Sequence, residues 1–263
     1  MLGWSINLFR VFGIQLAIHA SFLLLLAYYG YEGWTEGGLP GLVWSVGLIV
    51  LFFVCVILHE LGHSLTAKRY GVRVPRILLL PIGGMAEFDH IPRQPSAELL
   101  ITIAGPAVNF LLAAVLLPLC WRGLFQTEEV PVYSVANLLE QLWYANLVMG
   151  IFNLLPVFPM DGGRIFRALL AVKLPYLRAT YWAVMVGRLL ALGFALLAAF
   201  YFKNPVTCGL FLFIVFAGNA EYRQLLRREE DDRYWEEMAR RAGPVNTGAD
   251  DPNLPPVIVH GPN

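Results

Sequence analysis

The chain has 263 residues, of which 57% are hydrophobic and 14% charged, and its formal net charge at pH 7 is zero. Soluble domains carry about a quarter charged residues, so the composition argues against an ordinary soluble domain, and the neutral balance gives no indication of a nucleic-acid partner. Several stretches of 17 to 23 residues contain no Asp, Glu, Lys or Arg, and a helix of about 20 apolar residues crosses a bilayer. The sequence therefore predicts an all-α polytopic membrane protein embedded in lipid.

Six transmembrane spans are predicted along the chain. Each is a predominantly apolar run, although Arg188 interrupts the fifth, and an Arg inside a membrane faces the protein interior or extends to the interface. The expected bounds are Val11–Tyr29, Gly41–Thr66, Glu98–Trp121, Ser134–Pro156, Thr180–Phe202 and Pro205–Ala220.

The loops between these spans predict an orientation. Lys and Arg are concentrated after the second, fourth and sixth spans, whereas the loops after the first, third and fifth contain few of them. Loops rich in Lys and Arg stay in the cytoplasm, so both termini are expected there, as an even number of spans also requires. The expected location is the cell membrane, with the chain as a multi-pass protein.

Two regions are not predicted to span the membrane. The segment Val72–Phe88 is too short and is broken by prolines and glycines, so we expect a small membrane-associated β-hairpin after the second span. We expect residues 1–220 to form the six-span domain. Residues 221–263 are then a charged cytosolic helix, followed from Gly243 by a disordered tail rich in Pro, Gly and Asn.

The second span ends in His59-Glu60-Leu61-Gly62-His63. Residues four apart share one face of a helix, so the two imidazoles converge. Zinc binds two such nitrogens and a third protein ligand, which leaves a position for water, and Glu60 can take a proton from that water. The alternative is a helix end whose polar side chains meet lipid headgroups. Ionisable groups inside a span are costly and functional as a rule, which favours a site for one zinc ion.

The end of the fourth span offers a third ligand on the same side of the membrane. Pro156 and Pro159 interrupt the helix there, and the glycines after Asp161 allow a close approach of the backbone. Asp161 is therefore a candidate zinc ligand. Its alternative role is an N-cap of the following helix, and one residue can serve both purposes.

Four motifs together resemble the site-2 protease family of intramembrane zinc metalloproteases, in the form without PDZ-like or CBS-like domains. They are the HELGH motif, the Gly83-Gly84 turn, GPAVN at Gly105–Asn109, and NLLPVFPMDGG at Asn153–Gly163. The last motif is the most specific, because its Asn and Asp are separated by the spacing that the family shows.

The resemblance implies a set of roles for individual residues. His59, His63 and Asp161 are implied as ligands of one zinc ion, Glu60 as general base, and Asn153 as a residue that holds the substrate peptide or the oxyanion. It also implies a transmembrane protein as substrate, cut within or near the cytoplasmic side of the bilayer.

Blander interpretations stand beside these roles. Asn153 can form an interhelical hydrogen bond instead, Asn109 and Gly105 are interpreted as packing residues, and His19 as a buried polar contact. A zinc transporter and a catalytically silent scaffold are the two rival functions. A transporter is expected to place ligands along a path through the bilayer and a silent relative to lack Glu60 or a ligand, and neither pattern is present.

Overall fold

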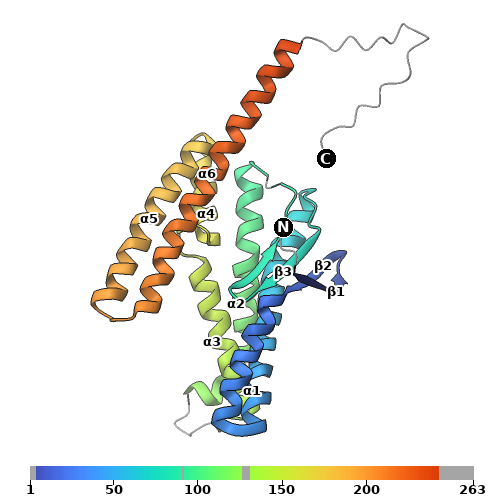
Figure 1. The fold of residues 1–263 in the computed structure, drawn as a ribbon, viewed down its shortest axis with the longest axis vertical. Helices are drawn as coiled ribbons and strands as arrows, with labels where there is room; N and C mark the ends of the chain where they lie inside the picture. The colour runs from blue at the N-terminus through green and yellow to red at the C-terminus, as the bar shows by residue number, and fades with distance from the viewer. Residues whose placement is uncertain (1–3, 91, 126–130, 243–263) are drawn as a thin grey trace, which may run out of the picture. The chain divides into compact units, whose positions relative to one another are not determined.

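The computed structural model describes residues 4–90, 92–125 and 131–242, where the chain is mostly helical with one small β-sheet (Figure 1). The helices are α1 (Ala20–Arg69), α2 (Pro95–Phe125), α3 (Val135–Asn153), α4 (Asp161–Ala171), α5 (Tyr176–Phe200) and α6 (Pro205–Ala242). The strands are β1 (Ser5–Val11), β2 (Ile14–His19), β3 (Arg76–Leu80) and β4 (Gly83–Ala86).

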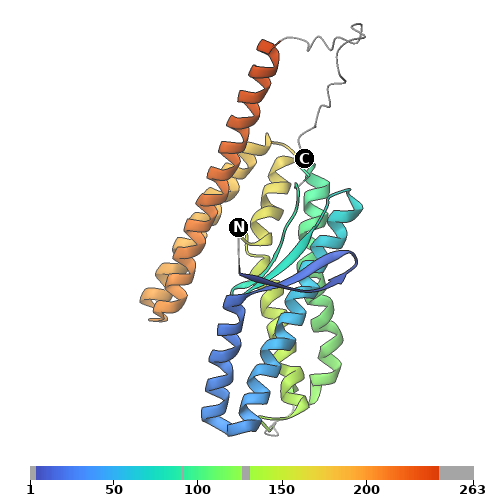
Figure 2. The same cartoon turned by 45° about the vertical axis from the view of Figure 1, so that its right-hand side comes forward.

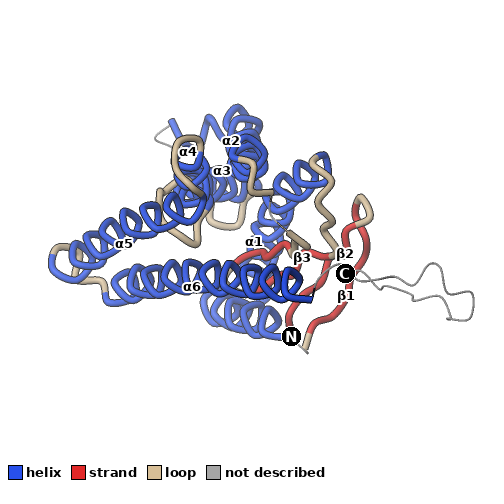
Figure 3. The backbone as a smooth tube through the Cα atoms, turned by 90° about the horizontal axis from the view of Figure 1, so that it is seen from above, coloured by secondary structure: helices blue, strands red, loops and turns tan. Residues whose placement is uncertain are grey.

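The four strands form a single sheet in the order β1-β2-β3-β4. β1 pairs with β2 and β3 with β4 in antiparallel fashion, whereas β2 and β3 are parallel. Figure 3 shows the strands β1, β2 and β3 side by side. Ile14 and Leu16 of β2 and Ile77 and Leu79 of β3 are buried in a common core with Val56 of α1. The hairpin predicted after the second span is therefore present as β3 and β4, but within a larger sheet.

The predicted first span, Val11–Tyr29, is wrong at its beginning. The chain remains in strands up to His19, with a turn at Gly13, and the helix starts only at Ala20. His19 is the N-cap, and its Nδ1 accepts a hydrogen bond from the N–H of Ser21. A short apolar run is compatible with a buried strand as well as with a helix, and the pairing of β2 with β3 selects the strand.

Helix α1 consists of two arms that meet at Gly37 and Gly38 and run side by side (Figure 2). Gly38 has a φ of 61°, in the left-handed region that glycine adopts at low cost. The arms approach closely, because a side-chain carbon added to Gly33 would collide with the carbonyl oxygen of Gly41. The second arm carries the HELGH motif, with His59 and His63 buried near its C-terminal end.

Within the described residues, four helices are long and apolar enough to cross a membrane, namely α1, α2 up to Cys120, α5, and α6 up to Met238. The chain is therefore a membrane protein. Helix α3, which covers most of the predicted fourth span, is not among these four, so the predicted count of six spans is not confirmed.

Helix packing places the end of α3 and the start of α4 next to α1. Helix α2 packs against α1 and α3, and α4 packs against α2 and α5. Ser134 caps α3 by accepting a hydrogen bond from the N–H of Asn137, a common helix start. The chain leaves α3 after Asn153, passes through a short loop and enters α4 at Asp161.

The chain divides into two compact units between Glu221 and Tyr222. Helix α6 continues across this division, so the charged segment predicted as a separate cytosolic helix at 221–242 is the C-terminal part of α6. The predicted disordered tail from Gly243 lies outside the described residues.

Candidate metal centre

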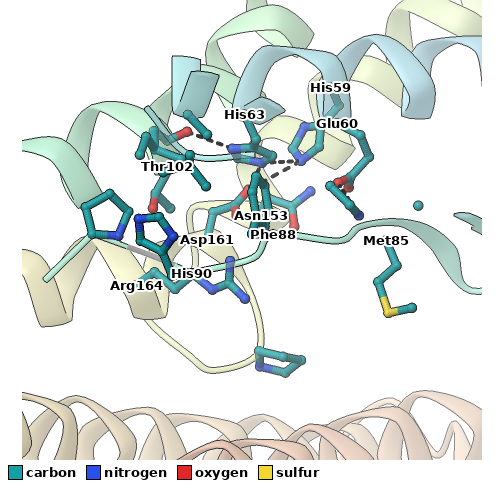
Figure 4. A pocket seen from close by; sticks show the side chains of 17 residues that line it. His59, Glu60, His63, Met85, Phe88, His90, Thr102, Asn153, Asp161 and Arg164 are labelled. Atoms are coloured by element: carbon teal, nitrogen blue, oxygen red, sulfur yellow. Dashed lines mark hydrogen bonds and ion pairs between the residues drawn. The ribbon is translucent and has the colours of Figure 1, made fainter. Parts of the chain in front are cut away.

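The two histidines of the HELGH motif meet an aspartate from a distant helix. His59 and His63 are buried in α1, and their Nε2 atoms lie 3.1 Å apart. Asp161, the first residue of α4, brings its Oδ2 to 3.3 Å from Nε2 of His59 and 3.2 Å from Nε2 of His63. The three side chains point toward one another in Figure 4. They form a possible metal site.

The loop between α3 and α4 delivers Asp161 to this point. Gly162 packs directly on that loop, where an added side-chain carbon would collide with the carbonyl oxygen of Leu154. The N-cap of α4 is Met160, and no side chain caps the helix. The alternative role of Asp161 as an N-cap is therefore wrong, and its carboxylate is directed at the histidines instead.

The outer nitrogens of both imidazoles also have partners. Nδ1 of His63 lies 2.8 Å from the backbone carbonyl oxygen of Ile101, and Nδ1 of His59 lies 2.5 Å from Oδ1 of Asn109. A carbonyl oxygen only accepts, so Nδ1 of His63 carries the proton and its Nε2 presents a lone pair to the site. The contact of Asn109 was not predicted from the sequence. The sequence did contain a signal for this contact, because a polar side chain inside an apolar span is costly unless it forms a hydrogen bond.

The electrostatics of the centre favour a cation. Oδ2 of Asp161 is buried and accepts no hydrogen bond within the described part of the chain. Two imidazole nitrogens and a carboxylate oxygen are a donor set typical of zinc. The residues present therefore fit a zinc ion.

Glu60 lies between the histidines and the edge of the sheet. Its Oε2 accepts a hydrogen bond from the backbone N–H of Ala86 in β4, with an N···O distance of 3.2 Å. Gly84 leaves room for it, since a side-chain carbon added there would crowd the Glu60 side chain. Of the described strands, β4 pairs with β3 alone, so Glu60 is bound at an edge strand of this sheet.

A cavity of about 220 Å³ opens onto His59, Glu60, His63 and Asp161. Asn153 lines this cavity, and its Nδ2 donates a hydrogen bond to the backbone carbonyl of Met149 over 3.0 Å. The structure thus brings all five predicted site residues to one cavity. It also adds lining side chains that were not predicted from the sequence, which are Met85, Phe88, His90 and Arg164 (Figure 4).

The glycine of the GPAVN motif packs against one of the candidate ligands. A side-chain carbon added to Gly105 would overlap the imidazole of His63. On the other helix, a side-chain carbon at Gly62 would crowd the backbone of Ala104. Gly105 is a packing residue, as interpreted from the sequence, but the group that it packs against is part of the metal centre.

Two residues whose roles were open lie elsewhere. His19 caps α1 through Ser21, and Arg188 is exposed on α5. Neither lines the cavity at the metal centre.

Known proteins resemble the chain in sequence and in structure. Residues 47–123 and 123–194 match peptidase family M50. The chain is 41% identical over 223 residues to a zinc metalloprotease of Methanocaldococcus jannaschii, an alignment that covers 84% of this chain and 62% of the relative. It is 32% identical over 200 residues to the putative zinc metalloprotease Rip3 of Mycobacterium tuberculosis, covering 72% of this chain and 49% of the relative.

A solved structure gives the same result. The site-2 protease from Methanocaldococcus jannaschii superposes with a TM-score of 0.60 at 40% identity, over 83% of this chain and 95% of that chain. The chain spans 62% and 49% of the length of the two curated relatives described above. The matched residues make up more than half of the sequence and include both His63 and Asp161. The chain therefore belongs to peptidase family M50, the family of the site-2 proteases.

Proposed function

We propose that the chain is a zinc-dependent endopeptidase that hydrolyses a peptide bond of a membrane-protein substrate, within or near the cytoplasmic side of the bilayer. The convergence of His59, His63 and Asp161 on one point, with Glu60 in the same cavity, carries this proposal. The relatives named as zinc metalloproteases support it.

In this proposal His59, His63 and Asp161 hold one zinc ion and Glu60 is the general base. Zinc in such a site lowers the pKa of a bound water and polarises the carbonyl to be attacked. The carboxylate of Glu60 takes the proton of the water and passes it to the leaving amine. Its hydrogen bond to the N–H of Ala86 holds this carboxylate beside the histidines.

Asn153 is proposed to bind the substrate peptide or the oxyanion. Its Nδ2 is already bonded to Met149, so Oδ1 is the atom that remains to accept a hydrogen bond from a substrate N–H, and a second Nδ2 proton remains to be donated. The side chain lines the same cavity as Glu60.

Strand β4 is proposed to receive the substrate. A transmembrane helix has its carbonyls in internal hydrogen bonds, so the substrate must unwind before it is cut, and an extended peptide can then add to the free edge of a sheet. Gly84 and Ala86 of β4 line the cavity, which supports this route. Substitutions to Pro along the segment Val72–Phe88 are expected to lower cleavage, and unchanged cleavage in such variants would count against strand addition.

The membrane arrangement is also a proposal. The two arms of α1, together with α2, α3, α5 and α6, would supply the six predicted spans of residues 1–220, with both termini in the cytoplasm and the region from 221 to 263 as a cytosolic extension. The cell membrane is the expected location.

The deciding experiment compares wild type with Glu60→Gln. Cleavage of a single-span reporter protein and the zinc content are measured on both purified proteins. We expect wild type to cut and Glu60→Gln to retain zinc while cutting at least about 100-fold more slowly, because loss of a general base typically costs 10²–10⁴-fold. If Glu60→Gln cuts as fast as wild type, the base is another residue. Zinc uptake into vesicles without any cleavage would favour a transporter, and zinc binding with neither activity would favour a scaffold.

A further inference from the structure

The imidazole of His59 is the end of a chain of buried hydrogen bonds that crosses three helices. Its Nδ1 lies 2.5 Å from Oδ1 of Asn109 in α2, and Nδ2 of Asn109 donates to Oδ1 of Asn146 in α3 over 3.0 Å. Nδ2 of Asn146 donates to the backbone carbonyl of Leu142 over 2.8 Å and contacts Sγ of Cys55 at 3.3 Å. Burial is almost complete, with exposed fractions of 5% for His59, 0% for Asn109 and 1% for Asn146.

The backbone carbonyl of Leu142, at the end of this series of hydrogen bonds, determines which group donates in each of them. The carbonyl of Leu142 has no proton, so the amide nitrogen of Asn146 must face it. Oδ1 of Asn146 therefore faces Asn109 and accepts from Nδ2, and Oδ1 of Asn109 is left facing His59. An amide oxygen only accepts, so Nδ1 of His59 is the protonated nitrogen and Nε2 presents its lone pair to Asp161 and His63.

His63, the second candidate ligand, is also protonated at Nδ1, but its hydrogen-bond acceptor is of a different kind. Nδ1 of His63 donates directly to the backbone carbonyl of Ile101, an acceptor that no side-chain substitution removes. Among the residues that the structure describes, Nδ1 of His59 has no backbone acceptor and depends on the side-chain amides of Asn109 and Asn146 instead. The orientation of one ligand is therefore open to mutation and that of the other is not.

We propose that Asn109 and Asn146 are positioning residues for the metal centre, an inference that rests on the proposed zinc site. They hold His59 as the tautomer protonated at Nδ1 and fix the plane of its ring. Without them a proton could move to Nε2, the atom that faces Asp161, and the ring could rotate. Partners of this kind behind a metal-binding imidazole are worth 10–100-fold in metal affinity.

Four substitutions separate positioning from packing. Asn109→Leu removes the acceptor while keeping the volume, and Asn109→Asp keeps an oxygen acceptor at the same place. Asn146→Leu removes the support of Asn109 without changing any atom that contacts His59. Thr180→Val is the matched control, because Thr180 is fully buried and donates to the backbone carbonyl of Tyr176, far from the metal centre in the chain.

The zinc affinity of each full-length protein in detergent is measured by competition with a chelating dye. We expect Asn109→Leu to bind zinc about 10- to 100-fold more weakly, and Asn109→Asp to stay within about threefold of wild type, because a carboxylate is an equally good partner of an imidazole N–H. Asn146→Leu should weaken binding by about three- to tenfold, because the unsupported amide of Asn109 can turn its NH₂ group toward the ring. Thr180→Val should leave zinc affinity unchanged.

A second measurement reads the tautomer without zinc. In the metal-free protein labelled with ¹⁵N-histidine, the Nδ1–H signal of His59 should be present in wild type and in Asn109→Asp and absent from Asn109→Leu. The Nδ1–H signal of His63 should persist in all of them, since its backbone acceptor remains.

Two results overturn the proposal. Wild-type zinc affinity in Asn109→Leu would mean that Asn109 only packs, and an equal loss in Asn109→Asp and Asn109→Leu would mean that the oxygen acceptor opposite His59 does not set the zinc affinity. These results are distinct from a failure of the proposed function, because zinc affinity is measured apart from cleavage. If the wild-type protein binds zinc but cuts nothing, the role of Asn109 and Asn146 is still tested. If the wild-type protein binds no zinc, both this proposal and the proposed function are overturned.

Discussion

Helix α4 contacts the neighbouring helices through two buried polar clusters, which differ in their charge balance. At its start, Asp161 faces His59 and His63 of α1. Further along the same helix, Arg167 is paired with Glu98 of α2. Both clusters are buried, with exposed fractions of 3% for Arg167 and 1% for Glu98, so burial alone does not tell them apart.

The two clusters differ in whether they carry their own counter-charge. The guanidinium of Arg167 donates twice to Oε1 of Glu98, and it lies over the rings of Phe158 and Tyr176, 5.1 Å and 4.9 Å from their centroids. This cluster contains both a cation and an anion. At the metal centre, the Asp161 carboxylate faces two nitrogen lone pairs. A buried charge without compensation is costly, so the second cluster is the one that requires an external cation.

The largest expected effect comes from breaking the cluster that compensates itself. Arg167→Met leaves Glu98 buried without its partner and should lower the free energy of unfolding by about 3–5 kcal/mol. Thermal unfolding of the purified protein measures this. The double variant Arg167→Met with Glu98→Leu should recover most of the loss, because neither charge of the buried pair then remains. A double variant as unstable as the single one would show that the ion pair is not what matters.

The metal centre should respond in the opposite way. Asp161→Asn removes a ligand and should weaken zinc binding by at least about 100-fold, which corresponds to about 2.7 kcal/mol, while the metal-free protein unfolds no more easily than wild type. Zinc added to wild type at 100 times its dissociation constant should stabilise the fold by about 2.7 kcal/mol, and should not do so for the variant. Destabilisation of metal-free Asp161→Asn would mean that Asp161 supports the fold as Arg167 does.

A smaller effect is expected at Gly105, which packs against the edge of the His63 ring that carries Nε2. Gly105→Ala places a methyl group against the imidazole and should weaken zinc binding by about tenfold, or about 1.4 kcal/mol, because the ring must shift. Gly193→Ala is a matched control in α5, where an added side-chain carbon meets open space, and should leave zinc affinity as it is. Equal affinities for both variants would show that the packing of His63 does not set the geometry of the site.

The sequence predicted those parts of the site that depend on short-range geometry. His59, Glu60 and His63 are placed by the pitch of one helix, so their arrangement follows from their spacing alone. The distribution of basic loops predicted that Asp161 lies on the same side of the membrane as the histidines, and the structure brings the three side chains together. Both arguments use periodicity or charge, which a single sequence contains.

Other features could not be read in this way. The apolar residues before Ala20 looked like the start of a span, but they pair with β3, which lies more than fifty residues later. Asn109 was interpreted as a packing residue because the sequence around it does not indicate that His59 is its hydrogen-bond partner. Whether a buried amide packs or orients a ligand depends on which atoms lie opposite, and that is a property of three helices together.

By itself, then, the sequence determined that this is a membrane protein with two histidines on one helix face, a glutamate beside them and an aspartate on a separate segment. These conclusions rest on composition and helical periodicity. Only the tertiary structure decided that Asp161 is directed at the histidines and not at its own helix terminus, that Glu60 is bound by the edge of a four-stranded sheet, and that Asn109 and Asn146 stand behind His59. Hydrogen bonds between distant segments depend on packing in three dimensions, and their partners have no fixed spacing along the chain.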